Sequence, residues 1–181
     1  MCWIIFAVFW FVSALSTKRT AERQSLPSQL LYMIFLVLGA WLLFNGFNRP
    51  LYPLGLAILP HSSVAIGIGV VFTILGLLLA LWARVTLGAN WSSAVTFKEH
   101  HELVQRGPYA FVRHPIYTAL LLMFLGTAIA LGTLGGFIGW PLVFISVWIK
   151  LKQEEKLMMS HFPTDYPAYK YRVKALIPFI F

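Results

Sequence analysis

Residues 99–117 of this 181-residue chain read EHHELVQRGPYAFVRHPIY, and long apolar segments lie on both sides of them. The stretch holds three of the chain's five histidines, two of its arginines and two of its six acidic residues. Polar groups beside membrane-length apolar runs are costly, so they usually mark a site. We therefore interpret the rest of the chain as a scaffold that holds this stretch at a membrane surface.

The composition is that of a membrane protein. The chain is 59% hydrophobic and 11% charged, with a mean hydropathy of +0.77, whereas soluble domains are about 25% charged. The net charge of +8 is placed in a way that favours orientation in a bilayer and contact with membrane lipids. No pattern typical of nucleic-acid binding occurs. Cys2 is the only cysteine, which excludes an internal disulfide and a cysteine metal cluster.

Five apolar segments predict an all-α integral membrane protein with about five transmembrane helices. Pro115 suits the first turn of the fourth helix, and the fifth is expected to continue as an amphipathic helix over 150–161. Lys18 and Arg19 follow the first segment, which favours a retained helix over a cleaved signal, although Ser13-Ala14 keeps cleavage open. The expected apolar segments are 2–15, 30–46, 64–83, 116–131 and 137–149.

Three glycines in the third segment have two interpretations. Gly67, Gly69 and Gly76 would let neighbouring helices approach closely. Alternatively, they are simply tolerated in a membrane helix.

Positive charge predicts the orientation. With the N-terminus outside, segments 16–29, 84–115 and 150–181 lie inside and hold 13 of the 14 lysines and arginines, while Arg49 lies outside. Cytoplasmic loops are enriched in such residues. We therefore expect a multi-pass protein whose polar stretch and C-terminal tail face the cytoplasm and build one site.

The residues available at that site favour chemistry. Arg113, His114 and Tyr117 lie where the chain re-enters the membrane, and Glu154 and Glu155 lie at the inner end of the fifth helix. A short hairpin between the last two helices would bring these groups together. The alternative is interfacial anchoring, since arginine and tyrosine often reach toward headgroups without any further function.

Other sites have weaker support. His100, His101 and His114 lack the HxxxH and HExxH spacings of metal sites, so we expect no metal. No GxSxG occurs and Asp165 is the only aspartate, which argues against a serine hydrolase. Nucleotide-binding glycine motifs are absent too.

Four blocks resemble the isoprenylcysteine carboxyl methyltransferase family, and membrane phospholipid methyltransferases share much of this pattern. The resemblance divides the chain into an N-terminal three-helix scaffold, 1–84, and a catalytic region, 85–181. The blocks are LGANWS at 87–92, HELVQRGPYAFVRHPIY at 101–117, EE at 154–155 and DYPAYKYRVKALIPFIF at 165–181.

The resemblance implies a methyltransferase that uses S-adenosylmethionine and releases S-adenosylhomocysteine. Its cofactor pocket would be formed by the cytoplasmic re-entrant region and the C-terminal amphipathic helices. Glu154, Lys150 and Arg113 would serve catalysis. The cofactor-binding positions would be His101, Glu102, Leu103, Val104, Tyr109, His114, Pro115, Ile116, Tyr117 and Glu154.

One position departs from the family. Lys150 stands where the family has an arginine that contacts the substrate. An arginine guanidinium can bind a carboxylate through two parallel hydrogen bonds, whereas a lysine ammonium group acts as a point charge. The acceptor, a lipophilic small molecule or a lipidated group methylated on O, S or N, is therefore left open, as is the oligomeric state. An amine acceptor would need a base, for which Glu155 and His114 are candidates.

Two alternative functions remain: an NADPH-dependent reductase of the sterol-reductase type, and a membrane scaffold without catalysis.

Overall fold

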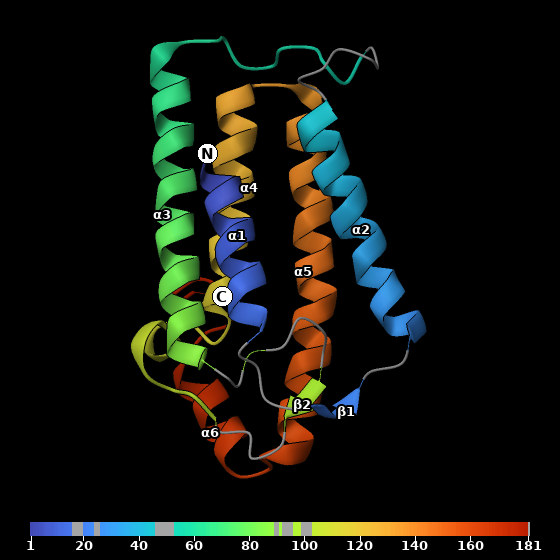
Figure 1. Cartoon of the computed structure of the whole chain (residues 1–181), viewed down its shortest axis with the longest axis vertical. Coiled ribbons are helices and arrows are strands. Elements are labelled where there is room, and N and C mark those ends of the chain that lie inside the picture. The colour runs from blue at the N-terminus through green and yellow to red at the C-terminus, as the bar shows by residue number, and fades with distance from the viewer. Residues whose placement is uncertain are drawn as a thin grey trace.

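The computed structural model describes residues 1–15, 20–23, 26–45, 53–88, 91, 96–98 and 103–180. In these residues the chain forms a bundle of long helices (Figure 1), which confirms the predicted helical fold. The long helices are α1 (Cys2–Ala14), α2 (Leu26–Asn45), α3 (Ser63–Leu87), α4 (Pro115–Leu131) and α5 (Leu134–His161). A 3-10 helix, η3 (Gly107–Ala110), and a short helix, α6 (Asp165–Arg172), lie at one end of the bundle, here called the site end.

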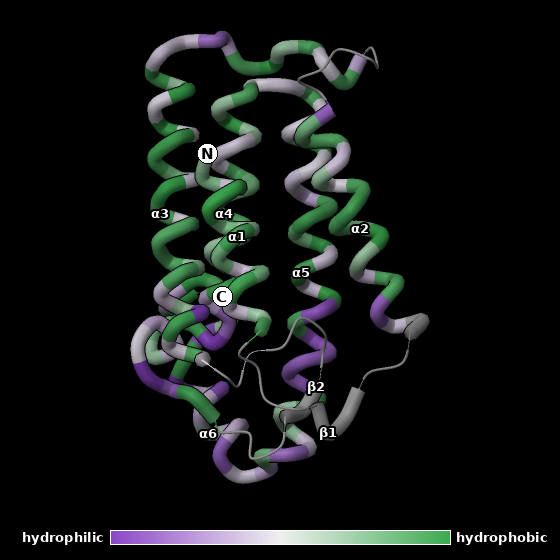
Figure 2. Tube along the Cα trace, viewed as in Figure 1, coloured by the Kyte–Doolittle hydropathy of each residue, from purple (hydrophilic) through white to green (hydrophobic). Residues whose placement is uncertain are grey.

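The helices differ in their capacity to cross a membrane. α2, α3 and α5 each hold a stretch long and apolar enough to do so, whereas α1 and α4 are shorter apolar helices. Apolar residues cover the bundle along most of its length and hydrophilic residues gather toward the site end (Figure 2). α5 is one continuous helix of 28 residues, so the predicted extension through 150–161 is confirmed.

Glycines let the helices touch backbone to backbone near the end opposite the site. A Cβ atom on Gly69 of α3 would lie 2.4 Å from the carbonyl oxygen of Gly126 on α4. A Cβ atom on Gly139 of α5 would lie 2.5 Å from the carbonyl oxygen of Gly39 on α2. The predicted close approach is thus confirmed for Gly69, and also for Gly76, where a Cβ atom would lie 2.7 Å from the carbonyl oxygen of Ala119 on α4. A Cβ atom on Gly67 would have no described neighbour within 4 Å, so the alternative, a glycine simply tolerated in the helix, holds there.

A tight turn joins α4 to α5. Gly132 ends α4 with a φ of +64°, a left-handed conformation that glycine adopts at little cost. The next residue, Thr133, caps α5, because its hydroxyl accepts a hydrogen bond from the backbone N–H of Gly136. Since the connection is so short, the two helices run antiparallel and the first turn of α4 lies beside the last turns of α5. We call the end with this turn the hairpin end.

A small ribbon was not predicted. β1 (Thr20–Arg23) pairs antiparallel with β2 (Thr96–Lys98), so the chain segments after α1 and after α3 meet. The ribbon lies at the site end, as does α6 (Figure 1). The segments that the charge pattern grouped on one side of a membrane therefore do lie at one end of the molecule.

Candidate functional site

The C-terminal segment is fastened to the start of α4. The backbone N–H groups of Arg113 and His114 donate to the carbonyl oxygens of Lys174 and Ala175, at 2.8 and 3.0 Å. One turn later the Thr118 hydroxyl donates to the carbonyl oxygen of Leu176 at 2.7 Å. Chain segments about 60 residues apart in sequence therefore form one wall of the site.

A buried carboxylate joins three parts of the chain. Glu155 of α5 is only 2% exposed and accepts hydrogen bonds from Nε and Nη2 of Arg113 at 3.0 and 2.5 Å. Its other oxygen accepts from Nζ of Lys170, on α6, at 2.8 Å. The Nη1 group of Arg113 donates to the carbonyl oxygens of Lys170 and Val173. Both oxygens of Glu155 and all three guanidinium nitrogens of Arg113 are thus engaged within the protein.

The neighbouring carboxylate faces different partners. Glu154 is half-buried and accepts a hydrogen bond from the Tyr117 hydroxyl. Its other oxygen lies 3.7 Å from Nδ1 of His114. The imidazole stacks on the Tyr117 ring, with 5.6 Å between centroids and 13° between planes. The predicted convergence of His114, Tyr117 and Glu154 is therefore present in the structure.

Lys150 lies one helical turn before Glu154. Its ammonium group sits over two aromatic rings, 5.4 Å from the centroid of Tyr32 and 5.5 Å from that of Tyr117. Tyr32 belongs to α2 and is 4% exposed. Sequence reasoning missed Tyr32, because a tyrosine within an apolar run looks like any core residue until α2 is packed against α5.

η3 positions a third aromatic group. Gly107 begins this helix with a φ of +60°, and Pro108 and Tyr109 are buried behind it. The hydroxyl of Tyr169, on α6, donates to the carbonyl oxygen of Tyr109 at 2.6 Å. Burial raises the pKa of Tyr109 and of Tyr169 well above the usual value for a phenol. Both hydroxyls therefore stay protonated, as hydrogen-bond donors, at neutral pH.

Two buried polar atoms make this region suitable for a ligand. The Tyr109 hydroxyl and Nε2 of His114 have no hydrogen-bond partner among the described residues. The nearest carboxylate oxygen to Nε2, on Glu155, is 3.6 Å away. Since buried polar groups are normally satisfied, these two atoms and the Glu154 carboxylate form a donor and acceptor set that fits a polar cofactor.

The other predicted cofactor residues are placed less specifically. Leu103 and Val104 are half-buried in the segment before η3, Pro115 is buried in the first turn of α4, and Ile116 is half-buried beside it. His101 and Glu102 lie outside the described residues.

Another buried cation, Arg84, holds the helices together, since it donates to the carbonyl oxygens of Ser13 and Gly88.

Comparison with known proteins identifies the family of the chain and several relatives. Residues 64–165, more than half of the chain, match the phospholipid methyltransferase family. Protein-S-isoprenylcysteine O-methyltransferase of Schizosaccharomyces pombe is 31% identical over 142 residues, which are 75% of this chain and 57% of that protein. Its counterpart B in Arabidopsis thaliana is 30% identical over 118 residues, 62% of this chain and 58% of that protein.

The fold has a solved counterpart. A eukaryotic intramembrane Ras methyltransferase, isoprenylcysteine carboxyl methyltransferase, aligns with a TM-score of 0.59 and 29% identity, covering 83% of this chain and 53% of that one. The chain thus spans a little over half the length of the relatives it matches. The resemblance inferred from the four sequence blocks is confirmed, and the chain belongs to the phospholipid methyltransferase family.

Proposed function

We propose that this protein is a membrane methyltransferase that uses S-adenosylmethionine and methylates a lipophilic acceptor of the isoprenylcysteine type. The observation that carries the proposal is the meeting of His114, Tyr117 and Glu154 beside Lys150. The names of the relatives support an acceptor that bears a carboxylate on a prenylated cysteine.

The cofactor would supply a methyl group bonded to a sulfonium cation. Tyr109 and His114 would offer their unpaired polar atoms to its polar groups, and Glu154 would accept from an amino or hydroxyl group. The face of the Tyr117 ring can stabilise a nearby cation. We also assign Leu103 and Val104 to this pocket, together with His101, Glu102, Pro115 and Ile116 at the positions that the family pattern matches.

Lys150 would hold the acceptor. Its ammonium group, between the rings of Tyr32 and Tyr117, can pair with a carboxylate and set it in line with the methyl group. A carboxylate is already ionised at neutral pH and needs no general base. Acceleration would then come mainly from positioning the two reactants, an effect worth up to about 7–11 kcal/mol in favourable systems.

We propose a positioning function for Arg113. All its guanidinium nitrogens bind other parts of the protein, so it would act by holding α5, α6 and the C-terminal segment around the pocket. Glu155 would do the same from the other side of this ion pair. Most of the hydrogen-bonding capacity of both side chains is thus used within the protein.

Cofactor binding is the direct test. Isothermal titration of the purified full chain in detergent should detect S-adenosylhomocysteine, and Glu154→Ala or His114→Ala should weaken binding by about tenfold or more, as expected when a charged or buried hydrogen-bonding group is lost. Asp165→Ala removes a carboxylate and His61→Ala an imidazole, each at an exposed position, and both variants should bind normally. No detectable binding by the unaltered chain would refute the proposal.

Acceptor chemistry needs a separate measurement. Labelled S-adenosylmethionine is offered with a farnesylated cysteine, with its methyl ester and with phosphatidylethanolamine, and the methylated product is identified by mass. Only the free carboxylate should react, and Lys150→Gln should raise KM for it while leaving S-adenosylhomocysteine affinity unchanged. Methylation of the amine instead would overturn the acceptor but keep the reaction class.

We further propose five membrane crossings, with the site end in the cytoplasm. The charge distribution supports this orientation. Replacing Cys2 by serine and the exposed Thr164 by cysteine creates one reporter thiol at the site end. In sealed cells it should react with an impermeant maleimide only after permeabilisation; labelling of intact cells would reverse the orientation.

A further inference from the structure

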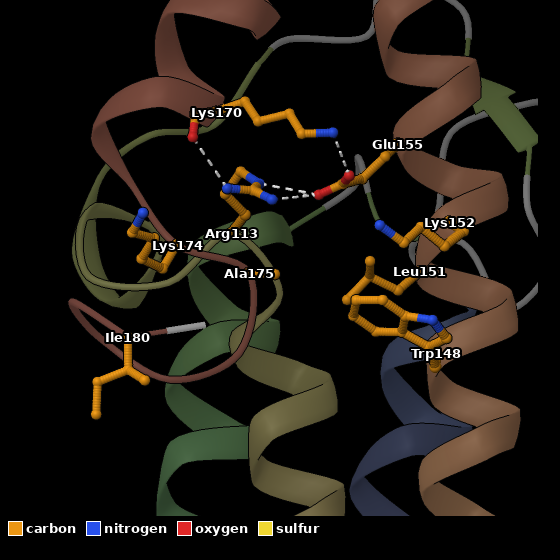
Figure 3. Close-up of a pocket in the computed structure, with 9 residues that line it drawn as sticks. All are labelled: Arg113, Trp148, Leu151, Lys152, Glu155, Lys170, Lys174, Ala175 and Ile180. Carbon is orange, nitrogen blue, oxygen red and sulfur yellow. Dashed lines mark hydrogen bonds and ion pairs between the residues drawn. The ribbon is translucent and has the colours of Figure 1, made fainter.

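A cavity lies beside the Arg113–Glu155 ion pair, and both of these residues line it. It has a volume of about 280 Å³ and lies between the last turns of α5 and the C-terminal segment (Figure 3). None of His114, Tyr117 and Glu154 is among the residues that line it. The cavity is therefore distinct from the residues to which we assign the cofactor.

The lining of this cavity is strongly cationic. Arg113, Lys152, Lys170 and Lys174 face a single acid, Glu155, so four positive charges oppose one negative charge. Two of these cations, Arg113 and Lys170, are paired with Glu155. The other two, Lys152 and Lys174, are exposed and form no ion pair with another described residue. An anionic group is thus the chemically matched occupant.

The remainder of the lining is apolar. Trp148, Leu151 and Ile180 contribute to it, and the ammonium group of Lys152 lies 4.3 Å from the centroid of the Trp148 ring. Paired tryptophan and lysine side chains are typical of the depth where the hydrocarbon core meets the headgroups. In sequence, α5 changes from apolar to charged over residues 148–156, and hydrophilic residues gather toward this end of the helix (Figure 2). The lining therefore combines cationic and apolar groups, which match the anionic headgroup and the acyl chains of a membrane lipid.

We propose that this cavity binds an anionic phospholipid as a fixed partner, distinct from the methyl acceptor. Its phosphate lies between Lys152 and Lys174, and the start of an acyl chain lies against Trp148, Leu151 and Ile180. A volume of about 280 Å³ is many times the roughly 10–15 Å³ that one water molecule needs in the same measure, so it leaves room for a headgroup. A free phosphate would leave the apolar side unused, and a zwitterionic lipid would bring an unfavourable ammonium group to the lysines.

Native mass spectrometry of the full chain tests this proposal. The protein, released from micelles that contain equal amounts of phosphatidylglycerol and phosphatidylcholine, should retain phosphatidylglycerol preferentially. The double variant Lys152→Gln/Lys174→Gln should lower that preference by about tenfold or more, because each lysine near an anionic lipid contributes separately. S-adenosylhomocysteine binding by the same variant should be unchanged, which separates this result from the outcome for the proposed function.

A matched variant distinguishes a built site from a diffuse charge effect. Lys156→Gln/Arg172→Gln also removes one cation from α5 and one from the C-terminal region, at exposed positions outside the cavity, and should keep the preference. An equal loss in both double variants would overturn the proposal. Displacement of a short-chain phosphatidylglycerol by an equal concentration of inorganic phosphate would also overturn it, in favour of a free-phosphate site.

Discussion

Near the hairpin end the helices meet backbone to backbone, whereas at the site end charged and aromatic side chains join them. Gly69 and Gly126, like Gly39 and Gly139, bring main chains so close that no side chain fits between them. At the site end, by contrast, Glu155 is surrounded by donors from two further segments. Dispersion and close fit are sufficient for apolar helices in lipid, but a binding pocket needs polar groups, and polar groups need partners.

The difference predicts that the site end depends on single residues more than the hairpin end does. Arg113→Ala removes the main partner of the Glu155 carboxylate, a residue that is only 2% exposed. We expect the free energy of unfolding to fall by about 3–5 kcal/mol, the usual cost of breaking a buried ion pair. Unfolding by SDS in mixed micelles, followed by circular dichroism, measures this loss.

A double-mutant cycle checks the cause of that loss. Arg113→Met/Glu155→Leu removes both charges and should cost less than the sum of the two single changes, because no charge is left buried alone. Additive losses would show that the ion pair is not what holds the site end together.

At the hairpin end, stability should depend on the volume of the side chains between the helices and not on their charge. Gly69→Val puts a side chain where a Cβ atom already comes within 2.4 Å of the Gly126 carbonyl oxygen, so α3 and α4 must separate. We expect a loss of about 1–3 kcal/mol, as for other overpacked sites, in the same SDS unfolding measurement.

Gly67→Val is the matched control. It makes the same change two residues earlier, where none of the described residues would come within 4 Å of a Cβ atom, and it should cost less than about 0.5 kcal/mol, as surface changes usually do. Similar losses at both positions would mean that helix propensity, and not helix contact, sets the cost.

These two glycines show how far the sequence alone can lead. The apolar segments and Pro115 predict the helices and the start of α4 correctly, because length and hydropathy are properties of the segment itself. Which glycine faces a neighbour depends on rotation about the helix axis: positions 67 and 69 differ by about 200° at 100° per residue. A segment that is apolar all round carries no signal that would distinguish these faces.

For the candidate site, too, the sequence predicts some residues and misses others. His114, Tyr117 and Glu154 were predicted together because they are polar residues beside apolar runs and because the hairpin is short. Tyr32 was missed, since its place depends on how α2 packs against α5. The β1–β2 ribbon was missed too: its strands have four and three residues, too few for an alternating pattern to stand out.

The smallest expected effect concerns the attachment of α6. Tyr169→Phe removes the hydroxyl that donates to the carbonyl oxygen of Tyr109 and should lower the free energy of unfolding by about 0.5–1.5 kcal/mol, the net worth of one hydrogen bond. Tyr171→Phe removes the same atom from a side chain that is 89% exposed and should have almost no effect.

The pH dependence of unfolding provides an independent check on the same residue. Because burial raises the pKa of Tyr169, only the unfolded chain loses this proton just above pH 10. The stabilisation is therefore complete below about pH 10 and falls above it, by at most about 1.36 kcal/mol per pH unit for each such group. Tyr169→Phe should make the decline between pH 10 and 11 shallower than in the unaltered chain. An unchanged slope would place the Tyr169 hydroxyl in water and contradict its hydrogen bond to the carbonyl oxygen of Tyr109.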